Sequence, residues 1–254
     1  GMVCHETYKD ENNKWLSPDE IITIEGKKYT KNNQSQKVKV GPSESMSKSK
    51  KNTIDPEKII ENYGADSARL FILSDSPPEK DVQWSDEGMI SSYKFVQKLW
   101  ILNQKILDKI KINQTNATGN ELKKITSQFI QNVENNIKNF SYNKIIANFH
   151  EVYSKLNKIV EKKINKEDWI SNYKDILIAM NPVIPHFSNE CLEMLKIEEK
   201  ILWPTIDEKI LVEENINIVI QVNGKTRGVI KANKDISEDE LLSEINKDLK
   251  IKNY

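Results

Sequence analysis

The chain has 254 residues, and at about 150 residues per domain this length suggests two domains. Hydrophobic residues make up 37%, and 38 basic residues balance 38 acidic ones, so no global field draws the chain to nucleic acid or to an anionic membrane. Its two cysteines, Cys4 and Cys191, are far apart in sequence, which argues against a disulfide scaffold or a zinc ribbon and fits a reducing compartment.

The chain lacks the run of about 18 apolar residues that a membrane helix needs, and it does not open like a signal peptide. We therefore expect a soluble, cytoplasmic protein without a membrane partner. Because the sequence starts at Gly1 and not at methionine, we also expect it to be a piece of a longer protein.

Residues 1–54 show short extended runs, such as 28–30 and 38–40, between polar loops. Asp55-Pro56-Glu57 predicts a helix start, because Asp caps free amides and Pro tolerates the first turn. Gly64 is expected to end this helix in the left-handed conformation, and a second short helix is expected over 65–73.

Helical spacing of apolar residues then persists from residue 86 to about 197 and predicts four or five amphipathic helices, hence an antiparallel helix bundle. Ser141 is the expected cap of the third helix, and Pro182 and Pro185 interrupt the chain near its end. Three aromatic residues on the apolar stripes are expected in the core: Trp100, Phe129 and Phe149.

In the last 50 residues the spacing of apolar residues changes from a helical period to the alternation of a strand. Alternation over 216–222, the pair Asn223-Gly224 and a return over 226–231 predict a β-hairpin. Ser237 with Glu240 is a capping box that opens a helix running through Leu249. A hairpin and one helix bury too little to fold alone, so we expect an incomplete α+β domain here.

A basic, serine-rich segment lies between the first strands and the first helix. Between positions 37 and 51 the single acid is Glu44, and the stretch is too polar to pack. The lysines there are Lys37, Lys39, Lys48, Lys50 and Lys51. Taken alone, such a run is usually a solvated turn. A lysine ammonium beside hydroxyl groups is also suited to following a moving phosphate.

The wider pattern resembles the leucyl-tRNA synthetase family of class I aminoacyl-tRNA synthetases. Met46-Ser47-Lys48-Ser49 is similar to the KMSKS signature. The other matching segments, in chain order, are Gly1-Met2-Val3, Ser17-Pro18-Asp19-Glu20, Ile54-Asp55-Pro56, Tyr63-Gly64-Ala65-Asp66-Ser67-Ala68-Arg69-Leu70, Ser76-Pro77-Pro78-Glu79-Lys80-Asp81-Val82-Gln83-Trp84-Ser85, Asn181-Pro182-Val183-Ile184-Pro185-His186 with Glu190, Trp203-Pro204 and Gln221-Val222-Asn223-Gly224-Lys225-Thr226-Arg227-Gly228.

The resemblance implies a mainly α protein with three parts. Residues 1–85 would be the end of a Rossmann-like catalytic domain with the KMSKS loop and stem-contact helices. Residues 86–205 would be an anticodon-binding-type helix bundle that binds tRNA, and residues 206–254 the start of a small C-terminal α+β domain. The family uses ATP, with Mg²⁺, to activate leucine as leucyl-adenylate and then charges tRNA(Leu), as a monomer.

By the same resemblance, the loop Ser45, Met46, Ser47, Lys48 and Ser49 would bind ATP. Lys48 would be the catalytic residue, because its charge would stabilise the phosphates as pyrophosphate leaves. The first lysine of the signature is Ser45 here, so either loop closure is weakened or Lys50 and Lys51 compensate.

For tRNA contacts the hairpin residues Lys225 and Arg227 are the candidates. Gly224-Lys225-Thr226 imitates the end of a P-loop but has Val219 where the first glycine belongs, so we interpret it as a turn. No metal site is expected, because the three histidines share no ligand spacing with the cysteines, and His186 is interpreted as a structural residue at a helix start.

Two other functions stay open. One is an isoleucine, valine or methionine synthetase, which the segment 221–228 disfavours, and the other is a binding module for tRNA or protein without catalysis. The His-x-Gly-His signature of class I synthetases is missing from the chain, so we expect the chain alone to be inactive.

Overall fold

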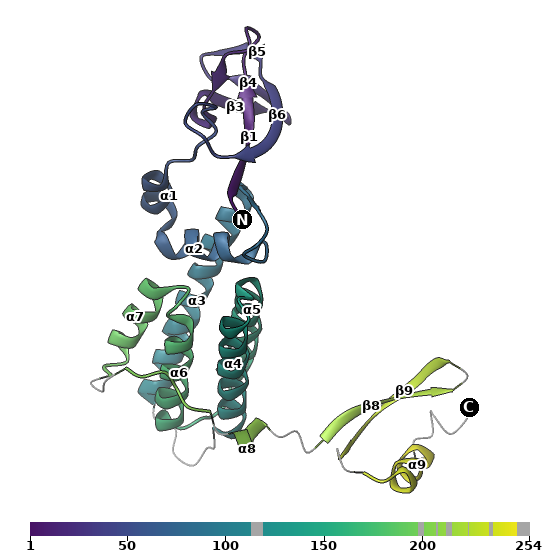
Figure 1. The fold of residues 1–254 in the computed structure, drawn as a ribbon. Helices are drawn as coiled ribbons and strands as arrows, with labels where there is room; N and C mark the ends of the chain where they lie inside the picture. Colours follow the sequence, from purple (N-terminus) through teal and green to yellow (C-terminus); the bar gives the residue numbers. More distant parts are fainter. Residues whose placement is uncertain are drawn as a thin grey trace. The chain divides into compact units, whose positions relative to one another are not determined.

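The computed structural model divides into two compact units, residues 1–206 and residues 207–254, which are described separately (Figure 1). The residues that the structure describes are 1–112, 119–197, 201–206, 208–211, 215–222, 224–233 and 236–247.

The first unit begins with two small sheets. In one, strand β1 (Val3–Lys9) pairs antiparallel with β2 (Trp15–Leu16) and β6 (Lys39–Ser45) and parallel with β7 (Val82–Gln83). The other is an antiparallel meander of β3 (Ile21–Ile24), β4 (Lys27–Thr30) and β5 (Asn33–Lys37), which follows the 3-10 helix η1 (Pro18–Glu20). Because His5 faces Glu44 across β1 and β6, the chain that leaves β6 starts its next loop beside β1.

Two short helices follow this loop, α1 (Pro56–Tyr63) and α2 (Ala65–Ser74). The predicted cap of α1 is confirmed, since the Asp55 carboxylate accepts the Glu57 N–H at 3.0 Å. Gly64 ends α1 with φ +80° and ψ 153°. The positive φ agrees with the prediction, but this ψ lies outside the left-handed helical region, so Gly64 forms a corner that only glycine adopts readily and not a left-handed cap.

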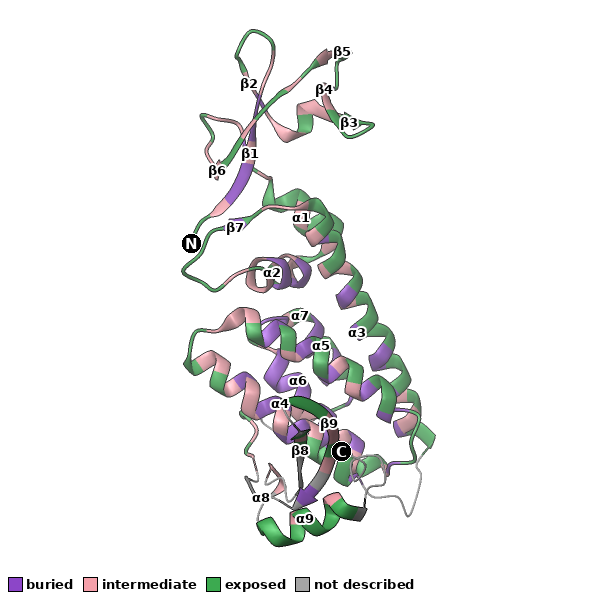
Figure 2. Ribbon diagram, turned by 90° about the vertical axis from the view of Figure 1, so that its right-hand side faces the viewer, coloured by how far each residue is buried: buried purple, intermediate pink, exposed green. Residues whose placement is uncertain are grey.

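The bundle consists of α3 (Asp86–Ile112), α4 (Asn120–Lys138), α5 (Tyr142–Ile159), α6 (Lys166–Met180) and α7 (Pro185–Met194). Contacts join α4 to α5 and α6, α3 to α5 and α6, and α6 to α7. Figure 2 shows the buried faces of these helices turned towards one another. The mainly helical fold class is confirmed.

The core of the bundle is apolar and closely packed. Phe149, Trp169 and Ile176 are each 0% exposed, and Phe129 is 4% exposed, so the core positions expected for Phe129 and Phe149 are confirmed. Within the described ranges, none of the helices combines the length and the apolar content that crossing a membrane requires.

Two expectations about the bundle are wrong. Trp100 is 37% exposed, because the buried stripe of α3 runs through Leu99 and Asn103 and leaves Trp100 at its edge, beside a groove of about 850 Å³ between α1, α3 and α7. Ser141 precedes α5 but gives no side-chain cap. Its backbone is not extended (φ −93°, ψ 58°), and its hydroxyl donates instead to the Asn139 carbonyl at 3.4 Å.

Helix α2 is joined to the start of α7 by two charged side chains. The Asp66 carboxylate is 6% exposed and accepts the backbone N–H of Phe187 at 2.7 Å and of His186 at 3.3 Å. The Arg69 guanidinium donates to the carbonyls of Val183 and Pro182, both at 2.8 Å. We call these four hydrogen bonds the α2–α7 joint.

The second unit contains α8 (Glu208–Leu211), the hairpin β8 (Asn215–Val222) and β9 (Lys225–Asn233), and α9 (Glu238–Lys247). The hairpin and the capping box are confirmed: Gly224 has φ +74°, and the Ser237 hydroxyl accepts the Glu240 N–H at 3.3 Å while the Glu240 carboxylate accepts the Ser237 N–H at 3.1 Å. Asn223 and Leu249 lie outside the described residues.

Candidate functional site

The basic segment forms a loop between β6 and α1, and residues 44–52 are named the basic loop below. Its first turn is tied to the sheet, because the Met46 N–H donates to the Val3 carbonyl at 3.3 Å. Ser45, Lys48 and Ser49 are exposed, whereas Met46 and Ser47 are half-buried. The structure therefore presents the side chain of Lys48 outward on a loop whose start is fixed to β1.

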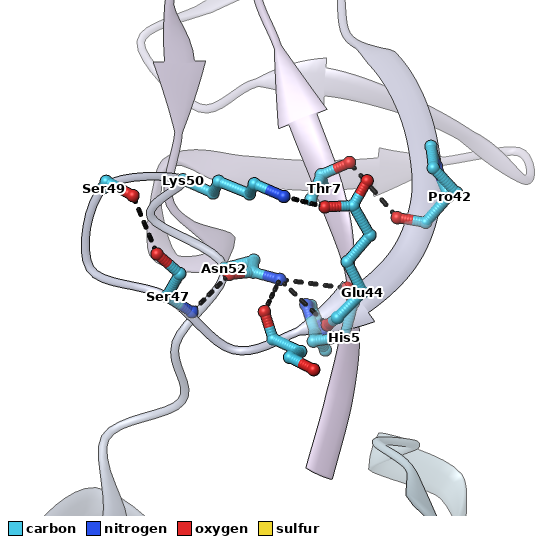
Figure 3. Close-up of polar contacts among 9 residues, drawn as sticks. His5, Thr7, Pro42, Glu44, Ser47, Ser49, Lys50 and Asn52 are labelled. Atoms are coloured by element: carbon cyan, nitrogen blue, oxygen red, sulfur yellow. Dashed lines mark hydrogen bonds and ion pairs between the residues drawn. The ribbon is translucent and has the colours of Figure 1, made fainter. Parts of the chain in front are cut away.

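Asn52 closes the basic loop from inside. Its side chain is 0% exposed, and its amide Nδ2 lies within hydrogen-bond distance of three carbonyl oxygens, those of His5 and Glu44 at 3.2 Å and of Ser45 at 3.4 Å. Its Oδ1 accepts the Ser47 N–H at 2.8 Å. One side chain thus joins β1, the end of β6 and the turn that carries Lys48 (Figure 3).

The three lysines of the turn have different surroundings. The Lys50 ammonium pairs with the Glu44 carboxylate (Figure 3), and the Lys51 ammonium lies 3.5 Å from the Glu20 carboxylate. Hydrogen bonds from Ser17, with the Lys51 charge in addition, hold the pKa of Glu20 below its usual value. For Lys48 no described group pairs with the ammonium. An incoming anion can therefore bind Lys48 without displacing a carboxylate.

Hydroxyl groups lie on either side of Lys48 along the chain. The Ser47 and Ser49 oxygens are 2.8 Å apart and hydrogen-bond to each other (Figure 3). Ser45, which replaces the signature lysine, is exposed and contributes its carbonyl to Asn52. Since the next cations, Lys50 and Lys51, are held by carboxylates, a replacement of the missing charge by either one requires that its ion pair be broken.

The hairpin candidates belong to the other unit. Lys225 is exposed at the first position of β9, opposite Val222, and Arg227 is half-buried two residues later on the same strand. The structure brings these two residues near each other on one strand, in a unit separate from the basic loop.

The histidines and cysteines lie in separate environments. Among the described residues, no three His, Cys, Asp or Glu side chains gather in a way that could hold a metal ion. His150 stacks on Phe95, with ring centroids 3.8 Å apart, and burial lowers the pKa of its imidazole. Burial raises the pKa of the Cys191 thiol to about 12, so this thiol is inert at neutral pH. His186 stands at the start of α7, as expected.

Two family models match the chain in the order that the sequence pattern predicts. Residues 36–85, which include the basic loop, match tRNA synthetases class I (I, L, M and V). Residues 119–242 match the anticodon-binding domain of tRNA ligase.

Curated relatives match almost the whole chain. A leucine–tRNA ligase of Rickettsia bellii is 40% identical over 95% of the chain, and one of Orientia tsutsugamushi is 39% identical over 100% of it. The chain is homologous to leucine–tRNA ligases. It covers 29% and 30% of the length of these two relatives, so it corresponds to a segment of them.

A solved structure has the same fold. The chain superposes with a TM-score of 0.70 on a crystal structure described as the ternary complex of Agrobacterium radiobacter K84 agnB2 LeuRS-tRNA-LeuAMS, at 22% identity, covering 82% of this chain and 28% of that one. The superposition shows the shared fold, and the curated relatives, which are leucine–tRNA ligases, confirm the resemblance to leucyl-tRNA synthetases and favour the leucine enzyme over its isoleucine, valine and methionine relatives.

Proposed function

We propose that the chain supplies leucine–tRNA ligase with the loop that acts on ATP and with the helices that bind tRNA(Leu). In this reaction the leucine carboxylate attacks the α-phosphorus of ATP, pyrophosphate leaves, and the leucyl group then passes to tRNA(Leu). The homology to leucine–tRNA ligases over 95–100% of the chain supports the assignment. A monomer in the cytoplasm is the form that we propose.

The observation that carries the catalytic part of the proposal is the exposed Lys48 on the basic loop, whose ammonium has no ion-pair partner among the described residues. Negative charge builds on the phosphates as the bond to pyrophosphate breaks, and a positioned ammonium stabilises that charge more in the transition state than in the ground state. Ser47 and Ser49 can turn their hydroxyls to the same phosphate oxygens. Catalysis by Lys48 is then electrostatic, and no bond to the protein forms.

ATP brings its Mg²⁺ to this reaction, and the donor set of the basic loop is suited to phosphate. The loop offers an ammonium and hydroxyls, and its one acid, Glu44, is paired with Lys50. We therefore assign Lys48 to the phosphates and no ligand of the metal to this loop.

The test of this role is ATP–pyrophosphate exchange with leucine. The chain is joined to the upstream segment of a leucine–tRNA ligase, and the variant Lys48→Ala is compared with Lys31→Ala, an exposed lysine of the β4–β5 turn. Removal of one transition-state donor lowers kcat by about 100- to 1,000-fold. We expect this loss for Lys48→Ala, with the KM for leucine little changed. Equal losses in both variants would refute this role of Lys48, and exchange by the isolated chain would refute the expectation that the chain alone is inactive.

For the helical part we propose that residues 86–205 bind tRNA and that residues 206–254 begin a further tRNA-contacting domain, while residues 1–85 complete the catalytic domain. The match of residues 119–242 to an anticodon-binding domain supports this division. Lys225 and Arg227 are proposed phosphate contacts. Replacing either with Ala is expected to weaken tRNA binding and to reduce the slope of log affinity on log salt by about one.

A further inference from the structure

We propose that Asn52 is the positioning residue of the basic loop, which sets where Lys48 stands relative to ATP. The inference rests on the proposed function for its catalytic consequence, although its structural part can be tested without that function.

The first argument is the number of backbone segments that one buried amide holds. Asn52 donates towards His5 on β1 and towards Glu44 and Ser45 at the end of β6, and it accepts from Ser47, the residue before Lys48. These bonds join the end of the turn, at Asn52, to β1 and to the start of the turn at the end of β6. Since the side chain is 0% exposed, water does not reach these groups while the loop stays in place, so losing the bonds leaves buried polar groups unsatisfied unless the loop opens.

The second argument is that the rest of the turn is weakly held. The ion pairs of Lys50 and Lys51 involve side chains that are about 40% exposed, and such pairs contribute little to a fixed geometry. The bond between the Ser47 and Ser49 hydroxyls lies within the turn itself and does not attach it to the sheet. Besides the partly exposed Lys51–Glu20 pair, the described contacts that attach the turn to the body of the unit are the Met46 N–H bond to Val3 and the bonds of Asn52.

The third argument concerns chemistry. Asn has both a donor and an acceptor at the end of a short side chain, and the site uses both. A carboxylate at this position keeps the acceptor for Ser47 but directs an oxygen at three carbonyl oxygens in a buried place. Alanine removes every bond and buries no charge. The two substitutions therefore disrupt the same anchor in different ways.

The first experiment uses the chain itself. Trypsin at low concentration cleaves after Lys48, Lys50 and Lys51 only when the basic loop leaves its anchored form, and cleavage after the exposed Lys31 is the internal reference. We expect Asn52→Asp and Asn52→Ala to raise the cleavage rate in the loop at least about tenfold, with the rate at Lys31 unchanged. The matched control is Asn12→Asp, the same change at an exposed asparagine that adjoins neither Lys31 nor the basic loop. A loop rate equal to that of the control overturns the proposal.

The second experiment asks whether Asn52 acts through Lys48. In the joined polypeptide that carries out ATP–pyrophosphate exchange, Asn52→Ala is expected to lower kcat by about 10- to 100-fold with the KM for leucine unchanged. In the Lys48→Ala background the same substitution is expected to cost less than about threefold, because the loop no longer carries the charge that it positions.

The outcomes separate the two proposals. If the two losses multiply in the double variant, Asn52 acts independently of Lys48, and the positioning role is overturned. Multiplying losses are what a merely structural role of Asn52 predicts. If the joined polypeptide shows no exchange, it is the proposed function that fails, and the trypsin rates alone decide whether Asn52 anchors the loop.

Discussion

Replacing Asp66 with alanine tests whether the α2–α7 joint holds the first unit together. The buried carboxylate accepts two backbone N–H groups at the start of α7, and the bond to Phe187 is short. A hydrogen bond to a charged group contributes about 1.5–3 kcal/mol, and the longer bond to His186 adds about 1 kcal/mol. The interaction of the charge with the helix dipole is included in these values. We expect Asp66→Ala to lower the free energy of unfolding by about 2.5–4 kcal/mol.

The assay is urea unfolding followed by tryptophan fluorescence. All five tryptophans lie within residues 1–206, so the signal reports the first unit. With a slope of about 2 kcal/mol per M, a loss of about 3 kcal/mol lowers the urea midpoint by about 1.5 M. Asp66→Asn keeps an acceptor oxygen and is expected to lose about half as much. Asp75→Ala, at the exposed end of the same helix, is the control and should change stability by less than about 0.5 kcal/mol. A midpoint for Asp66→Ala within about 0.3 M of this control would refute the reasoning.

Three further predictions concern single residues of the first unit. Burial lowers the pKa of His150, so the unfolded chain takes up a proton at this residue before the folded chain does as the pH falls below about 6.5. The stability that neutral His150 contributes is therefore complete above that pH and is lost below it. The drop in Tm from pH 7.5 to 5.5 should be smaller in His150→Gln than in the parent. Cys191 is 0% exposed with a pKa of about 12, so mass spectrometry should find it unmodified by iodoacetamide in the native chain and alkylated in urea. Gly64→Ala forces a side chain into the φ +80°, ψ 153° corner and should lower the free energy of unfolding by about 1–3 kcal/mol, and an unchanged urea midpoint would contradict this.

Local signals in the sequence predict the helices and some of their ends, although they fail at Ser141. Asp55 and the Ser237–Glu240 pair act within a few residues of themselves, and the chain there behaves as the pattern predicts. Periodicity also located the core, but it does not say how wide a buried stripe is. Trp100 stands one position from Leu99, and only the packing of neighbouring helices decides that one is buried and the other borders a groove.

The basic loop could be recognised from its lysines and serines, whereas its anchor could not. Asn52 is joined to His5 across 47 positions of sequence, and nothing beside it in the chain distinguishes it from an ordinary loop asparagine. The pairing of Lys50 with Glu44 and of Lys51 with Glu20 likewise depends on the tertiary structure. The sequence predicts which residue types meet the phosphate, and the fold determines which of the three lysines is available.

The α2–α7 joint has an evolutionary consequence, because it recognises only main-chain atoms of its partner segment. Asp66 and Arg69 bind amides and carbonyls at 182, 183, 186 and 187, which every residue type supplies, apart from the N–H that proline lacks. The joint therefore makes no demand on the side chains at these four positions, although the apolar core separately constrains Val183 and Phe187, which are 3% and 6% exposed. In an alignment of homologues, the joint itself should therefore conserve positions 66 and 69 of α2, whereas positions 182 and 186 of the partner segment, whose side chains are exposed, should vary.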